Sequence, residues 1–117
     1  MAIKALFERL KSEFGLIPVA FYNHIKQNGD YAILTGFDRK NPNVKIARIK
    51  VLFVRNTLER EVYAYLDEIQ AFEDAIFKME RDLRAIILED MQIQSISEGQ
   101  FAYVFDLGFE VRRNDYL

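Results

Sequence analysis

The stretch from Phe101 to Val111 constrains the fold most, because every second residue in it is apolar. The apolar residues are Phe101, Tyr103, Phe105, Leu107, Phe109 and Val111. Successive side chains of a strand point to opposite faces, so this alternation predicts a strand with one buried, aromatic-rich face and one largely solvated face. A sheet of this kind is typically antiparallel and carries its helices on one side.

A change of period after Leu58 predicts a long helix. Apolar residues then recur alternately four and three positions apart, at Leu58, Val62, Tyr65, Ile69, Phe72, Ile76, Met79, Leu83 and Ile86. We expect a helix over 67–84, whereas 59–66 also alternates and stays open between helix and strand. The same spacing occurs in coiled-coil seams. We favour the core stripe of one amphipathic helix packed on a sheet, because the chain offers only residues 2–14 as a second helix.

The remaining segments complete a single α+β domain over residues 1–117. Before the long helix we expect a helix over 2–14, a β-hairpin with strands 19–25 and 31–37 around Asn28-Gly29, a polar loop over 38–43 and a strand over 44–55. After the long helix we expect strands over 91–97 and 101–113, joined by a hairpin turn at 98–100. The predicted order is therefore α-β-β-β-α-β-β.

Two positions in the predicted strands break the simple pattern. The third strand becomes apolar on both faces at Leu52 and Val54, so we expect that end to be covered by the rest of the fold or by a partner. Gly108 lies in the middle of the last strand, where a glycine indicates a bulge or a close backbone contact.

The composition and motifs of the chain argue against several kinds of functional site. The chain has no Cys and a single His, His24, which leaves no zinc site of ordinary type. The acidic residues of the long helix are typical of a solvated face, and no glycine-rich phosphate loop is present. No segment reaches the roughly 18 apolar residues of a membrane span. We therefore expect no enzymatic activity, no cofactor, no metal and no membrane contact.

The charge is distributed unevenly along the chain. Residues 1–56 carry ten Lys or Arg and four Asp or Glu, a balance of +6, and residues 57–90 carry four and ten, a balance of −6. Segments of opposite sign can pair within one molecule, pair between copies, or serve as ordinary solvated faces.

The order of elements and the length resemble the tail-terminator, or tail-completion, proteins of long-tailed bacteriophages. The matching pieces are the amphipathic stripe at 3–14, the strands 19–25, 31–37 and 44–55, the helix around 69–83, and the closing strand 101–113, which ends in Phe-Glu-Val-Arg-Arg. The resemblance implies a virion protein that forms a ring, usually of six copies, caps the tail tube and joins it to the neck proteins on the head side. A head-closure or neck adaptor, and a small cytoplasmic adaptor or regulatory domain that binds a protein partner, are the alternatives.

A ring needs two different surfaces on each copy that meet head-to-tail. We expect the following residues to contribute to them: Asp38, Arg39, Lys40, Asn41, Arg48, Lys50, Leu52, Val54, Arg112 and Arg113. An unpaired edge at the final strand would let the sheet of one copy extend into the next. Nucleic acid is expected only as DNA that passes through the ring.

Overall fold

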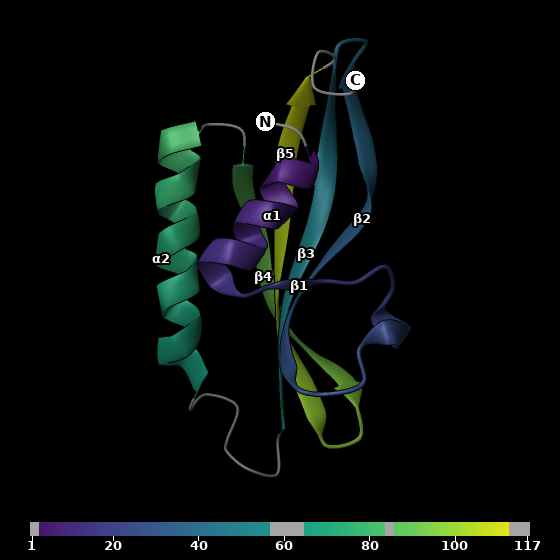
Figure 1. The fold of residues 1–117 in the computed structure, drawn as a ribbon, viewed down its shortest axis with the longest axis vertical. Helices are drawn as coiled ribbons and strands as arrows, with labels where there is room; N and C mark the ends of the chain where they lie inside the picture. The colour runs from purple at the N-terminus through teal and green to yellow at the C-terminus, as the bar shows by residue number, and fades with distance from the viewer. Residues whose placement is uncertain (1–2, 57–64, 84–85, 113–117) are drawn as a thin grey trace.

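Two helices lie against one face of a five-stranded sheet in the computed structural model of the chain (Figure 1). The structure describes residues 3–56, 65–83 and 86–112. Its elements are α1 (Ile3–Phe14), β1 (Ile17–Pro18), the 3₁₀ helix η1 (Tyr22–His24), β2 (Gly29–Asn41), β3 (Val44–Asn56), α2 (Leu66–Leu83), β4 (Ile86–Ser97) and β5 (Gln100–Arg112). The predicted α+β class and element order are confirmed.

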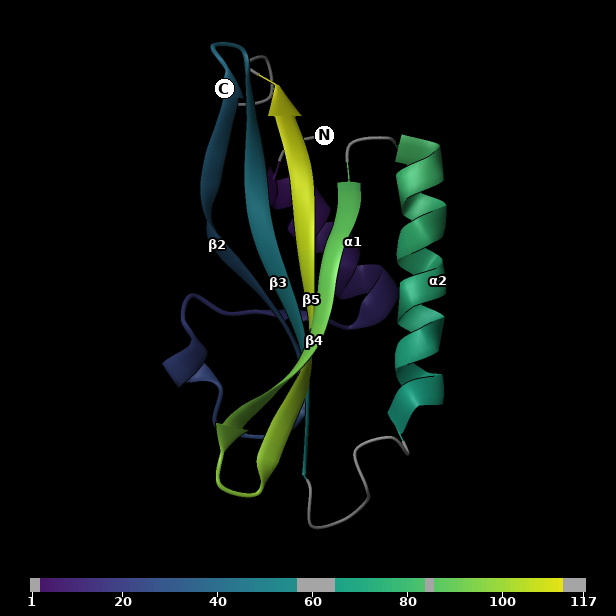
Figure 2. The same ribbon diagram turned by 180° about the vertical axis from the view of Figure 1, so that it is seen from behind.

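The sheet has the strand order β1-β2-β3-β5-β4. The three long contacts, β2 with β3, β3 with β5 and β5 with β4, are antiparallel, and only the two-residue β1 runs parallel to its neighbour. Seen from behind, the long strands twist together as one layer in front of α1 (Figure 2). The final strand, β5, therefore lies inside the sheet and has no unpaired edge, and the long edge strand is β4.

The main core lies between the helices and the sheet. The alternating apolar residues of β5 point into it, together with Leu6 and Leu10 of α1 and the stripe of α2. The ring of Phe72 packs edge-on against Phe14, Phe53 and Phe105, with centroid distances of 5.0 to 5.1 Å. The amphipathic interpretation of this helix is confirmed from Tyr65 onward, and the question of 59–66 falls largely outside the described residues.

A second, smaller core covers part of the opposite face of the sheet. Its members are Ile25, Tyr31, Ile33, Leu52, Val54, Ala102 and Val104. The prediction of a largely solvated face was therefore wrong for the half of β5 that begins at Ala102. The segment between β1 and β2 folds over this half, where it buries Ile25 and covers part of Val19, and burial of apolar side chains stabilises this arrangement.

The hairpin predicted over 19–37 is also wrong. Residues 22–24 form η1, and the segment pairs with β2 in parallel through β1 and through the N–H of Val19, which donates to the carbonyl of Ala32 at 3.0 Å. Gly29 has an extended backbone, with φ 159°, and begins β2 instead of closing a turn. The real hairpin joins β2 to β3: the predicted loop 38–43 is mostly strand, and the Oδ1 of Asn41 accepts the N–H of Asn43 at 2.8 Å in the tight turn.

The strand predicted at 91–97 begins earlier, at Ile86. The predicted close contact at Gly108 is confirmed, because a Cβ atom there would lie 2.7 Å from the Oε1 of Glu89 and 3.2 Å from the Cγ2 of Ile46. Gly108 pairs with Ile87, and a register shift between Leu88 and Asp90 follows in β4, with Glu89 as the extra residue. Glycine at position 108 therefore leaves room for the side chain of Glu89, the extra residue of β4, to lie over β5.

Candidate functional site

Three ion pairs lie along β2, β3 and β5. The Nη1 of Arg48 lies 2.6 Å from the Oδ2 of Asp38, and the Nζ of Lys50 lies 3.3 Å from the Oδ1 of Asp106. Nearer the tip of the β2–β3 hairpin, the Nζ of Lys40 lies 3.4 Å from the Oε1 of Glu110. Each pair joins a basic residue of the hairpin to an acid of the same chain. Several charges of the basic segment are thus matched within one molecule, and with acids outside residues 57–90.

The electrostatics of these pairs follow from their exposure. The hydrogen bond to Asp38 and the attraction of its carboxylate raise the pKa of Arg48, although both side chains face solvent. Burial lowers the pKa of Lys50, and its interactions with Tyr22 and Asp106 raise it by more, so the pKa lies above its ordinary value. Exposed pairs contribute little to stability. Their main effect is to give this surface both signs of charge.

The residues predicted for an interface separate into two groups. Arg39, Asn41 and Arg112 are exposed, as are the paired residues Asp38, Lys40 and Arg48, while Lys50 is half-buried. Leu52 and Val54 are fully buried in the second core, so of the two predicted alternatives, cover by the fold or by a partner, the structure shows the first. The fold itself covers this doubly apolar end of β3. Arg113 lies outside the described residues.

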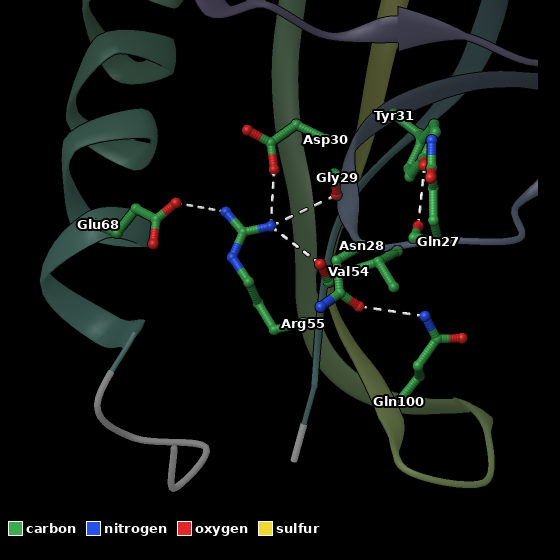
Figure 3. A network of polar contacts seen from close by, with 9 residues as sticks. All are labelled: Gln27, Asn28, Gly29, Asp30, Tyr31, Val54, Arg55, Glu68 and Gln100. Carbon is green, nitrogen blue, oxygen red and sulfur yellow. Dashed lines mark hydrogen bonds and ion pairs between the residues drawn. The ribbon is translucent and has the colours of Figure 1, made fainter. Parts of the chain in front are cut away.

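A polar cluster around Arg55 was missed by the sequence analysis (Figure 3). Its Nη1 donates to the Oδ1 of Asp30 at 2.8 Å and to the carbonyl oxygens of Val54 and Gly29 at 3.0 and 3.4 Å, while its Nη2 donates to Glu68. Because Glu68 belongs to the first turn of α2, the cluster fastens the start of this helix to β2 and β3. The sequence contains one indication of this cluster: Arg55 lies two residues after Phe53, so both side chains are on the same face of the strand.

The outer side of β4 is the most apolar exposed edge of the sheet. Ile87, Met91 and Ile93 are each more than two-fifths exposed. Near the start of the strand, the Oε1 of Glu80 from α2 accepts the backbone N–H of Leu88 at 2.9 Å. This carboxylate therefore occupies an edge donor that another strand would otherwise use.

An apolar groove of about 180 Å³ lies beside this edge. It is lined by Leu66 and Ile69 of α2, by Met91, Gln92 and Ile93 of β4, and by Tyr103, Val104 and Phe105 of β5. An apolar cavity of about 150 Å³ holds a benzene molecule in another protein, so this groove has room for one aromatic ring.

Other features offer little chemistry. A shallow hollow of about 740 Å³ on the face away from the helices is lined by Tyr22, Thr35, Lys50 and Gln94, among others, but the charge of Lys50 is already engaged by Asp106. Among the described residues, no three His, Cys, Asp or Glu side chains gather as metal ligands. None of the helices in the described ranges has the length and apolarity needed to cross a bilayer.

The chain was also compared with known proteins. It matches no protein-family model, and no curated protein matches it significantly.

Proposed function

We propose that the protein is a structural subunit of a bacteriophage virion without enzymatic activity. It assembles with copies of itself into a ring that caps the tail tube and joins it to the neck. The observation that carries this proposal is the edge of the sheet at β4, where exposed Met91 and Ile93 adjoin an apolar groove. Exposed apolar edges of this length are templates for strand addition, and monomeric proteins usually block them.

The two edges of the sheet favour a ring over a symmetric dimer. β4 forms one edge, and the outer side of β2 beyond the short β1 forms the other. A contact between two different surfaces joins copies head-to-tail. Such a contact closes into a ring when a whole number of these rotations makes one full turn. The long β2–β3 hairpin is then free to contact a neighbouring ring or a neck protein.

The charges of the hairpin argue against a dedicated nucleic-acid surface. Such a surface neutralises phosphates with clustered Lys and Arg. In the described structure Arg48, Lys50 and Lys40 each lie beside a carboxylate, so their positive potential is largely cancelled. Nucleic acid enters this proposal only as DNA passing through the ring.

Electron microscopy of the purified protein at high concentration tests the proposal. We expect annular particles with a constant number of subunits, near six. A cytoplasmic adaptor domain would instead give particles too small to resolve as rings at every concentration, and that result would overturn the virion proposal in its ring form. A melting temperature raised by Mg²⁺, Mn²⁺ or Zn²⁺ would contradict the absence of a metal-dependent activity, because a ligand bound only by the folded state stabilises it.

A further inference from the structure

A hollow of about 740 Å³ lies on the face of the sheet away from the helices. The 3₁₀ helix η1 contributes Tyr22 and Asn23 to its lining, and β2, β3 and β4 contribute the rest. Every lining residue except Ile96 carries a polar group in its side chain. Binding sites for small molecules have volumes of about 300–1,000 Å³. The hollow therefore has the size of such a site, and its polar lining indicates what kind of ligand fits.

Three polar side chains of the lining have no hydrogen bond within the part of the chain that the structure describes. They are the amides of Asn23 and Gln94 and the hydroxyl of Ser95. Thr35 donates its hydroxyl proton to the carbonyl oxygen of Arg48 at 3.1 Å, which leaves its oxygen able to accept. Side-chain amides both donate and accept. The hollow thus suits a ligand that carries donors and acceptors together, as hydroxyl groups do.

Lys50 is the one charged residue of the described lining, and its charge is balanced. Its Nζ lies 3.3 Å from the Oδ1 of Asp106, an oxygen that is buried and accepts no hydrogen bond of good geometry from the described residues. Moving the ammonium group to a ligand would leave this carboxylate oxygen buried without its counter-charge, which is costly. Phosphate groups and other anions are bound by Lys or Arg side chains that are free to contact them. The hollow therefore favours an uncharged ligand.

The backbone of β3 beneath the hollow is already paired. Lys50 belongs to this strand, which pairs with β2 on one side and with β5 on the other, so its N–H and C=O groups bond to neighbouring strands. A peptide that binds as an added strand needs the backbone groups of a free edge. Recognition at this face therefore falls to the side-chain amides and hydroxyls, which suit the hydroxyl groups of a sugar.

Tyr22 adds an aromatic ring to this polar hollow and is 40 % exposed. A sugar ring has hydroxyl groups around its rim and C–H groups on its faces, so one face can pack on an aromatic ring while the hydroxyls bond to polar side chains. Gln94 pairs with Ala102, and Lys50 pairs with Asp106, which lies four residues further along β5, or ~13 Å away. A ligand that contacts both Gln94 and Lys50 is therefore longer than one sugar ring.

We propose that the hollow binds a short, uncharged oligosaccharide through the side chains of Asn23, Gln94 and Ser95, with one sugar ring packed on Tyr22. The inference goes beyond the proposed function and does not depend on it, because the hollow lies on the opposite face of the sheet from the groove between α2 and β4. Hydrogen bonds between uncharged groups are individually weak, so we expect a dissociation constant of roughly 1 mM.

Titration of the ¹⁵N-labelled chain, followed by NMR, tests the inference. The probes are the disaccharides maltose, cellobiose, lactose and chitobiose, together with adenosine and inorganic phosphate. We expect at least one disaccharide to give saturable shifts at the amides of Asn23 and Gln94 and of their neighbours in the lining. Saturable shifts there with adenosine or phosphate, and none with any disaccharide, would overturn the inference and indicate a nucleoside or an anion as the ligand. The absence of a saturable shift with every probe would overturn it as well.

Two variants of one strand test the placement of the ligand. Gln94→Ala should weaken the binding of the disaccharide about three- to tenfold, as expected when hydrogen bonds between uncharged groups are lost. The matched control is Gln92→Ala, because Gln92 is the same residue type on the same face of β4 and does not line the hollow. It should leave the affinity within about twofold of the original. Equal losses for the two variants, in chains whose other amide shifts are unchanged, would overturn the inference.

Discussion

Replacing Phe72 by Ala should be among the most damaging changes to the core. Phe72 is 5 % exposed, lies at the middle of α2, and makes edge-on contacts with Phe14, Phe53 and Phe105. These partners belong to α1, β3 and β5, so a single ring connects both helices to the two central strands. No nearby side chain can fill the space without moving one of these elements.

The expected loss of stability can be worked from these contacts. Removing a buried Phe side chain costs about 3–5 kcal/mol, and each well-placed aromatic pair contributes about 0.5–1.5 kcal/mol beyond the area that it buries. With three such pairs lost, we expect a value in the upper half of the range, ~4 kcal/mol. Domains of this size are stable by about 5–15 kcal/mol in total, and the melting temperature should fall by roughly 10–20 °C.

Urea unfolding followed by circular dichroism measures this change, with Phe77→Ala as the control on the same helix. Phe77 is 47 % exposed, so its truncation should cost no more than about 1 kcal/mol. A loss below about 1 kcal/mol for Phe72→Ala, or equal losses for the two variants, would refute the placement of α2 over the sheet.

Three further predictions concern the polar contacts. Glu80→Gln should speed hydrogen exchange at the amide of Leu88, which the carboxylate now accepts at 2.9 Å, and unchanged exchange would exclude this protection of the edge. Interactions with Tyr22 and Asp106 raise the pKa of Lys50 above its ordinary value, so they stabilise the fold fully below the unfolded-state pKa and lose this effect as the pH rises through the higher folded-state pKa. The difference in unfolding free energy between Lys50→Met and the original chain should therefore shrink as the pH rises through the folded-state pKa, and a difference that does not change with pH would contradict these interactions. Arg48→Ala, at an exposed pair, should leave the unfolding curve nearly unchanged in the same assay.

The elements with strong periodicity were predictable from the sequence. The alternation of β5 and the stripe of α2 each span more than ten residues. Over that length only one type of secondary structure places all the apolar side chains on one buried face. Gly15 marked the end of α1 for a local reason, since its φ of 68° suits the left-handed position and its N–H donates to the carbonyl of Lys11 at 2.9 Å.

The segment between α1 and β2 was not predictable in this way. Val19 and Ile25 favour strands locally, but their burial against Leu52 and Val54 depends on residues distant in the sequence. The extension of β2 to Asn41 depends likewise on pairing with β3, which overrides the polar composition of Asp38 to Asn41. Short polar stretches carry no periodic signal, so only the tertiary contacts decide between strand and loop.

The candidate surface was predictable in part. The basic residues of the hairpin were identified, but their partners were not, because Asp38, Asp106 and Glu110 reach them through strand register. The edge at β4 was missed, since composition does not reveal which strand ends a sheet. Met91 and Ile93 have the alternation of an ordinary buried strand, and their exposure follows only from the strand order.

The solution mass, measured by light scattering after size exclusion over a range of protein concentrations and at two salt levels, tests the central claim most directly. The claim is that the chain assembles with itself through the edges of its sheet. We predict that the mass climbs reversibly from the 13.8 kDa of one chain toward about six times this value, and that lower salt favours the larger species because charges contribute to the contact. A mass that stays at one chain at every concentration and at both salt levels would contradict the account.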